Sequence, residues 1–109
     1  MGLTFAQKVL ARKAGLEQVV PGQIVTVRPD RLLTHDNTAA IARKFAKIGV
    51  QRMADPTMSV IVLDHVVPAA NETYAKNHQK IRAFVRQQGI TAFYDVGEGI
   101  CHQVLPEKG

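Results

Sequence analysis

The 109-residue chain has one cysteine, no tryptophan and no long apolar run. A single cysteine excludes an intramolecular disulfide framework and is typical of a reducing compartment. No apolar run approaches the roughly 18 residues that a membrane-spanning helix needs. The first residues, MGLTFAQKVLARKAG, carry scattered lysine and arginine and lack the apolar centre of a secretory signal. We therefore expect a cytoplasmic protein.

Aromatic side chains are also scarce, with four phenylalanines and two tyrosines in the whole chain. The formal net charge is +5, but the basic residues are spread along the sequence rather than clustered among aromatic side chains that could stack on bases. This distribution argues against a nucleic-acid-binding domain. The positive charge is equally consistent with attraction of a small polyanionic substrate, or with an acidic partner surface.

The composition is that of one globular domain, with 46% hydrophobic and 21% charged residues. Three helices are expected, each opened by a capping residue and closed by a glycine: 4–15, 37–49 and 71–89. Three strands are expected from runs of β-branched and apolar residues: 24–30, 58–64 and 90–96. Strand, crossover helix and strand form a βαβ unit, so the sequence predicts an α/β domain with a mostly parallel sheet.

Ligands of open parallel sheets bind beyond the carboxyl ends of the strands, and the sequence has polar residues at each such end. In chain order these are His35 and Asp36, then Asp64 and His65, then His102. Three of the four histidines are therefore expected at one edge of the sheet. This convergence favours acid–base chemistry on a small polar ligand.

The other candidate residues have simpler interpretations. Asp36 is expected to cap the helix at 37–49, and His78 is expected on a helix at the edge of the core. Cys101 and His102 are neighbours whose side chains should point apart, so they do not form a nucleophilic dyad. The pair also lacks the ligand spacing of a zinc site. We expect Cys101 to be a half-buried thiol without a chemical role.

Three stretches, HDNTAAIARKF, LDHVVPA and GICHQVLPEKG, resemble in this order the amino-terminal part of the aconitase superfamily. Within it they resemble the branch of 3-isopropylmalate dehydratase and homoaconitase large subunits. The opening GLTFAQKVLARKAG and VVPGQIV resemble the start of the same subunits, so the likeness covers essentially the whole chain. The resemblance implies that residues 1–109 are an amino-terminal fragment of an aconitase-like first domain, without the cluster-ligand region.

Members of this family move a hydroxyl group to the neighbouring carbon of a hydroxy acid by dehydration and rehydration, with a [4Fe-4S] cluster held by three cysteines. By matching motif, His65 would protonate the departing hydroxyl, Asp64 would hold this histidine charged and oriented, and His102 would line the cavity of the cluster and substrate. His35, with Asp36 beside it, falls where relatives contact the substrate. Cys101 resembles none of the cluster ligands, so the resemblance implies no metal ligand within this chain.

The leading hypothesis is therefore a fragment of a hydro-lyase large subunit that acts on 3-isopropylmalate in leucine biosynthesis. Its expected partners are a small subunit and the remaining part of the large subunit. Homoaconitate or a dimethylmalate-type acid is the alternative substrate, and a non-catalytic α/β interaction module is the alternative function. We expect the fragment alone to be inactive, to lack the cluster and to self-associate through uncovered apolar surface.

Overall fold

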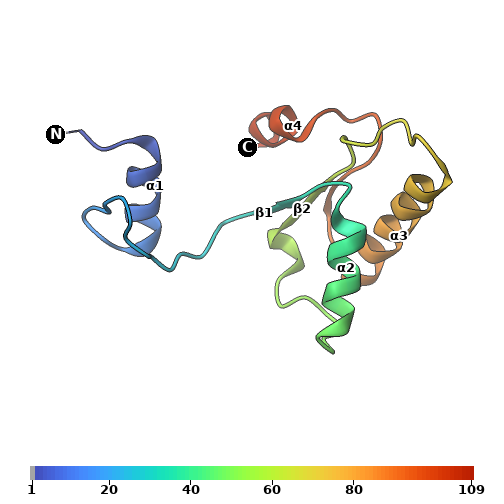
Figure 1. Ribbon diagram of the computed structural model, residues 1–109, viewed down its shortest axis with the longest axis horizontal. Helices are drawn as coiled ribbons and strands as arrows, with labels where there is room; N and C mark the ends of the chain where they lie inside the picture. Colours follow the sequence, from blue (N-terminus) through green and yellow to red (C-terminus); the bar gives the residue numbers. More distant parts are fainter. Residues whose placement is uncertain (1) are drawn as a thin grey trace. The chain divides into compact units, whose positions relative to one another are not determined.

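The computed structural model describes residues 2–109, which fall into two compact units (Figure 1). The first unit ends at Asp30, and the second spans Arg31–Gly109. No helix in the described part of the chain is both long enough and apolar enough to cross a membrane. Every candidate site residue lies in the second unit.

The first unit is built around helix α1 (Phe5–Ala14). Thr4 and Gln7 form the expected capping box, because the Gln7 amide donates to Thr4 Oγ1 (3.3 Å) and the Thr4 amide donates to Gln7 Oε1 (2.8 Å). Gly15 ends the helix at a φ of 69°, a left-handed conformation that glycine adopts at little cost. The helix predicted over residues 4–15 is confirmed.

The strand predicted over residues 24–30 is not formed, and that prediction is wrong. Ile24 is 97% exposed, and Val25 and Val27 are only partly buried, so the segment has little burial that would hold it in a ladder. Pro29 has no N–H to donate to a neighbouring strand. High β-propensity without a pairing partner leaves the segment irregular.

The second unit contains a three-stranded parallel sheet in the order β1–β2–β3. The strands are β1 (Leu32–Thr34), β2 (Ser59–Val62) and β3 (Ala92–Tyr94). Helix α2 (Thr38–Lys47) connects β1 to β2, and helix α3 (Glu72–Gln88) connects β2 to β3. These crossovers confirm the predicted α/β class with a parallel sheet. All three strands consequently end at the same edge of the sheet.

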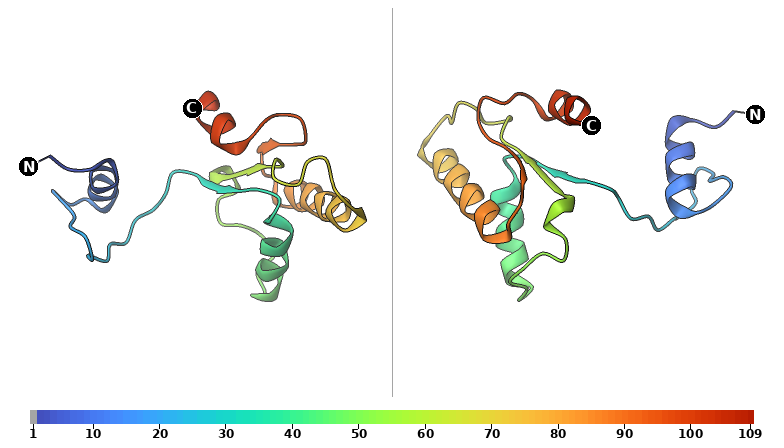
Figure 2. Two further views of the ribbon diagram at one scale, coloured as in Figure 1. Left: turned by 45° about the horizontal axis from the view of Figure 1, so that its top comes forward. Right: turned by 180° about the vertical axis from the view of Figure 1, so that it is seen from behind.

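The central strand β2 is buried along its whole length and contributes to a core on each face of the sheet. Ile61 packs with Ile81 of α3 on one face, and Val62 packs with Val104 of helix α4 (Cys101–Lys108) on the other. The views in Figure 2 show α2 and α3 on one side of the sheet and α4 on the opposite side. The alternation of side chains in β2 thus places one helical layer on each face.

The helix ends in this unit agree only partly with the sequence. Asn71 caps α3 as expected, since its Oδ1 accepts the Tyr74 amide at 3.0 Å, and Gly89 ends this helix. The N-cap of α2 is Asn37 rather than Asp36, and Asn37 makes no side-chain cap hydrogen bond. The predicted Asp36 cap is therefore wrong, and its carboxylate turns toward the loop that follows β2.

Two short helices were not anticipated from the sequence. A 3-10 helix, η1 (Pro56–Met58), leads into β2 and is capped by Asp55, whose Oδ1 accepts the Thr57 amide at 3.0 Å. Helix α4 is only eight residues long and includes Pro106, which reads as a helix-ending residue. The start of α4 matters for the site, because its first residue, Cys101, packs against the central strand β2 and donates its backbone N–H to Asp64, just after that strand.

Candidate active site

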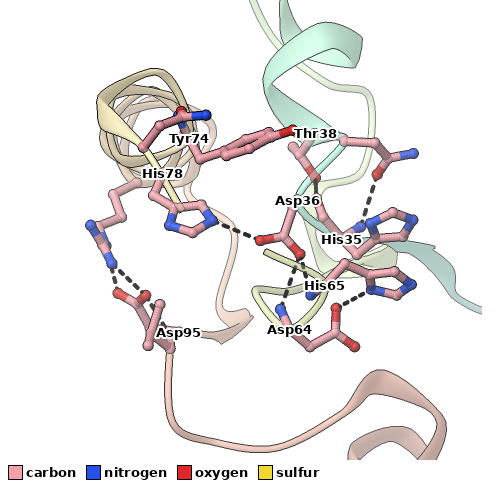
Figure 3. Close-up of polar contacts among 12 residues, drawn as sticks. His35, Asp36, Thr38, Asp64, His65, Tyr74, His78 and Asp95 are labelled. Carbon is pink, nitrogen blue, oxygen red and sulfur yellow. Dashed lines mark hydrogen bonds and ion pairs between the residues drawn. The ribbon is translucent and has the colours of Figure 1, made fainter. Parts of the chain in front are cut away.

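The loops after β1 and β2 bring four polar side chains together at the carboxyl edge of the sheet (Figure 3). They are His35, Asp36, Asp64 and His65. One ligand atom from each lies within 4.8 Å of the others. Parallel strands with short carboxyl-terminal loops explain this convergence, since neighbouring strands lie about 4.8 Å apart.

Asp64 and His65 form a hydrogen-bonded pair directly after β2. His65 Nδ1 lies 2.5 Å from Asp64 Oδ1, and Asp64 Oδ2 accepts the backbone N–H of Cys101 at 2.6 Å. The aspartate side chain is 2% exposed, whereas the histidine side chain is 46% exposed. Because Nδ1 is engaged, Nε2 is the ring nitrogen that remains for exchange with a ligand.

The electrostatics of this pair favour a charged histidine beside a charged aspartate. Burial alone would raise the pKa of Asp64, but the hydrogen bonds from the His65 side chain and the Cys101 amide outweigh it and hold this pKa below its usual value. The hydrogen bond to Asp64 raises the pKa of His65, and the nearby negative charges of Asp64 and Asp36 raise it further. The pair therefore presents a histidine that keeps its proton to a higher pH than a free imidazole does.

Asp36 lies behind this pair and is saturated with hydrogen bonds. Its Oδ2 accepts the backbone N–H groups of Asp64 (3.1 Å) and His65 (2.7 Å), and its Oδ1 lies 2.7 Å from Nε2 of His78. Burial would raise the pKa of Asp36, but these bonds, with that from the His65 amide the strongest, lower it. The side chain is only 6% exposed, so its oxygens face the protein rather than a ligand.

His35 lies flat against the ring of His65. The two ring centroids are 3.9 Å apart, and the planes are inclined by 15°. The backbone N–H of His35 donates to Asn37 Oδ1 at 3.0 Å, which fixes the turn that leads into α2. Its Nδ1 is buried and has no hydrogen-bond partner within the described residues. The stack restricts how the His65 ring can tilt.

Cys101 and His102 open α4, and the structure separates their environments. Cys101 is 2% exposed, so it is fully rather than half buried, and burial together with the neighbouring Asp64 carboxylate raises the pKa of its thiol. Such a thiol is a poor nucleophile. His102 is exposed, and within residues 2–109 the structure shows no hydrogen bond between its side chain and the four-residue group. The link between α4 and the site is the Cys101 backbone amide.

Two residues of the surrounding network were missed by the sequence analysis. His78 was assigned to the edge of the core, but it is buried and bonded to Asp36. Asp95, directly after β3, accepts hydrogen bonds from Nε and Nη2 of Arg82, at 2.7 and 2.8 Å. His78 lies three residues before the fully buried Ile81 on the same helix face, and that spacing alone signals a buried histidine in need of a partner.

The four-residue group has the residue types of a divalent-cation site, but its geometry favours a hydrogen-bond network. Each oxygen of Asp36 and Asp64 already accepts a hydrogen bond or ion pair from the protein. The stacked rings of His35 and His65 direct their nitrogen lone pairs along nearly parallel planes, not toward a common point. The arrangement is suited to holding and transferring a proton.

The residues of this chain do not fit a [4Fe-4S] cluster. Such a cluster requires several cysteine thiolates, and the chain contains one cysteine. That residue, Cys101, is buried and its raised pKa disfavours the thiolate. Cluster ligation is therefore not a property of these 109 residues.

Comparison with known proteins adds the family. The model of the aconitase family (aconitate hydratase) matches residues 7–109. Over its full length the chain is 47% identical to a probable 3-isopropylmalate dehydratase large subunit of Methanothermobacter thermautotrophicus and 40% identical to a 3-isopropylmalate dehydratase large subunit of Aquifex aeolicus. It is 42% identical, over 98% of its length, to a probable methanogen homoaconitase large subunit of Methanothermobacter thermautotrophicus. The chain spans about a quarter (26%) of each of these relatives. Because the family model matches nearly the whole sequence, the chain belongs to the aconitase family.

Proposed function

We propose that this chain supplies the leaving-group acid of a hydro-lyase, with Asp64 and His65 as the catalytic pair. The observation that carries the proposal is a half-exposed histidine whose Nδ1 is held by a buried carboxylate, at the carboxyl edge of a parallel sheet. The family membership and the large-subunit names of the relatives support the same reaction class. The activity belongs to a polypeptide that contains this segment and the remaining length of its relatives.

In the proposed dehydration, a hydroxyl group leaves one carbon of the substrate while a proton leaves the neighbouring carbon. Hydroxide is a poor leaving group, so His65 donates the proton on Nε2 to the departing oxygen and water is released. A base outside the described residues takes the proton from carbon, and the electron pair of that C–H bond forms the double bond. Rehydration reverses these steps with the hydroxyl on the other carbon, which returns the proton to His65.

Asp64 has two proposed tasks in this cycle. Its carboxylate stabilises the imidazolium before the transfer, and this stabilisation raises the pKa of His65. Its bond to Nδ1 also fixes which nitrogen faces the ligand, so the proton that moves is the one on Nε2. A neutral histidine remains after the transfer and is ready to accept a proton in the reverse direction.

The other histidines have proposed roles at the margin of this pair. His35 contacts the substrate from the face of the His65 ring on which it stacks. His102 lines the substrate cavity from the exposed start of α4. It follows Cys101, whose backbone N–H donates to Asp64. Asp36, first considered for substrate binding, is better placed as a support of the catalytic pair, because its carboxylate is almost fully buried.

For the substrate we propose 3-isopropylmalate, with homoaconitate or a dimethylmalate-type acid as the alternative. Relatives with both 3-isopropylmalate dehydratase and homoaconitase names match the chain at similar identity, so these 109 residues do not separate the two. The name "large subunit" supports a small subunit as partner. We further propose that the [4Fe-4S] cluster of the family takes its cysteines from the length of the relatives that this chain does not match.

The test is an assay of a large subunit that contains this segment, purified with its small subunit. We expect turnover of 3-isopropylmalate, homoaconitate or a dimethylmalate-type acid, followed by the change in ultraviolet absorbance as the carbon–carbon double bond forms or is hydrated. The matched control is the 109-residue chain alone, which we expect to be inactive and colourless after iron–sulfur reconstitution. Failure of the longer protein to dehydrate or hydrate any of these acids would contradict the proposed function. A stoichiometric cluster on the 109-residue chain would contradict the proposed origin of the cluster ligands.

A further inference from the structure

We propose that His78 is a positioning residue that holds the Asp64–His65 pair in place through Asp36, an inference that rests on the function proposed above. The path runs from helix α3 to the loop after β1 and then to the loop after β2 (Figure 3). Neither His78 nor Asp36 needs to touch the substrate. The effect of this path is to set the direction of the catalytic histidine.

The first step is the contact between Asp36 and the catalytic dipeptide. One carboxylate oxygen accepts two successive backbone N–H groups, those of Asp64 and His65. Two amides that converge on one oxygen fix the plane of the peptide bond between them, and with it the direction in which the His65 side chain leaves the backbone. Hydrogen bonds to a charged carboxylate are about twice as strong as neutral ones, so this constraint is firm.

The second step is the contact between Asp36 and His78. The two side chains are 6% and 5% exposed, and the atoms Oδ1 and Nε2 are 2.7 Å apart. A buried carboxylate that lost this partner would keep an unsatisfied oxygen in a site that water reaches poorly, which is unfavourable. His78 therefore determines where the Asp36 carboxylate can lie, and through it where the two amides can lie.

The third step is the anchoring of His78 itself. It lies near the middle of α3, three residues before Ile81, which is fully buried in the core beneath the sheet. Helix α3 begins at the Asn71 cap and ends at Gly89, so neither end is free to slide. A rigid helix thus carries the support for a side chain in a loop.

Helix α3 has a second tie to the sheet edge, and this provides a control. Arg82, one turn beyond His78, makes a bidentate ion pair with Asp95 after β3. The side chains of Arg82 and Asp95 are 34% and 41% exposed, and among residues 2–109 the structure shows no hydrogen bond or ion pair between them and the Asp64–His65 dipeptide. Loss of the Arg82 pair should weaken the attachment of α3 without releasing Asp36.

The experiment compares two amide substitutions that differ in reach. Gln at position 78 can place an N–H donor near the position of the histidine Nε2, whereas Asn is one carbon shorter and cannot reach Asp36. In the 109-residue chain, we expect the His65 backbone amide proton to move upfield in His78→Asn and to stay near its wild-type resonance in His78→Gln and Arg82→Met. In the longer subunit, kcat should fall about 10- to 100-fold for His78→Asn, because small misplacements of a catalytic group have effects of this size. KM should change little.

A merely structural role of His78 predicts a different pattern. It would lower the thermal midpoint of both His78→Asn and Arg82→Met while the kcat of folded protein and the His65 amide resonance stayed unchanged, and that result would overturn the proposal. If His78→Asn does not fold, His78→Gln is measured instead. A large shift of the His65 amide resonance in His78→Gln would also overturn the proposal. The amide resonance does not depend on turnover, so a failure of the proposed hydro-lyase activity is distinguishable from a failure of the positioning role.

Discussion

Two aspartate–histidine pairs lie at the carboxyl edge of the sheet, and they differ mainly in how much water reaches the histidine. In the pair of Asp36 and His78, both side chains are buried, at 6% and 5% exposure. In the pair of Asp64 and His65, the aspartate is 2% exposed but the histidine is 46% exposed. A buried imidazole can share its proton only with its partner, whereas a half-exposed one keeps a nitrogen for a ligand. Exposure, rather than residue type, separates the supporting pair from the proposed reactive pair.

The two pairs are also in contact, so they act in series. Asp36 accepts hydrogen bonds from the backbone N–H groups of Asp64 and His65 and is also bonded to the side chain of His78. It therefore connects the buried pair to the exposed pair. A substitution in the exposed pair should therefore lower kcat more than it lowers stability. A substitution in the buried pair should lower the free energy of unfolding. It should lower kcat only because it displaces the Asp64–His65 dipeptide.

The largest effect is expected from removal of the exposed histidine. In the longer subunit, His65→Asn should lower kcat by about 10² to 10⁴, because a positioned general acid is typically worth that factor. Folding should be preserved, since the side chain is about half exposed and the hydrogen bond from its backbone N–H to Asp36 remains. Steady-state rates with a thermal-melt control decide this prediction. A fully active His65→Asn enzyme would end the proposed role.

The next effect is expected from removal of the charge that holds this histidine. Asp64→Asn should reduce kcat less than His65→Asn does, because the imidazole remains. Asp64 raises the pKa of His65, so the proton is normally retained to a higher pH, and without the charge it is lost at a lower pH. The alkaline limb of the kcat profile should accordingly shift to lower pH, with the same shift in the histidine resonance on titration. An unmoved alkaline limb would show that a different group sets it.

The difference between the pairs also explains what the sequence could predict. Asp64 and His65 are adjacent and follow a run of apolar residues, so both the buried strand β2 and the polar residues at its end were predictable. His78 and Asp36 are 42 residues apart, and no local pattern pairs them. Their contact depends on the packing of α3 against the sheet. The periodicity of the sequence predicts which face of α3 is buried, but it does not predict which residue each buried side chain contacts.

The errors in the fold have similar causes. Residues 24–30 have strand propensity but lack a ladder partner within their compact unit, and propensity alone does not form a strand. Asp36 had a plausible local role as a helix cap. Its oxygens are instead bonded to two backbone amides and to the buried His78, so they do not cap α2. Helix α4 was hidden by its short length and Pro106.

A smaller effect is expected from the buried pair as the pH is lowered. The pKa of Asp36 is lowered in the folded chain, so its ionised form contributes stability above the ordinary aspartate pKa of about 4 and this contribution is lost as the pH falls through the folded value. The free energy of unfolding of the wild-type chain should therefore decline below about pH 4, and Asp36→Asn should reduce both the stability at neutral pH and the slope of this decline. Urea unfolding at a series of pH values measures both. Equal slopes in the two proteins would show that Asp36 is not among the responsible carboxylates.

The smallest effect is expected at the single cysteine. Cys101 packs with Val62 and Val104 at 2% exposure, so Cys101→Ser places a hydroxyl where an apolar thiol lay. The neighbouring Asp64 carboxylate can accept a hydrogen bond from that hydroxyl, which should limit the loss of unfolding free energy to about 1 kcal/mol. Cys101→Ala is the matched control, since it removes the sulfur without adding a donor. The kcat of both variants should stay close to that of the wild type, because the raised pKa of the thiol leaves it protonated and the link from α4 to the site is the backbone amide. A folded Cys101→Ser enzyme with a kcat as low as that of His65→Asn would instead place the thiol in the reaction.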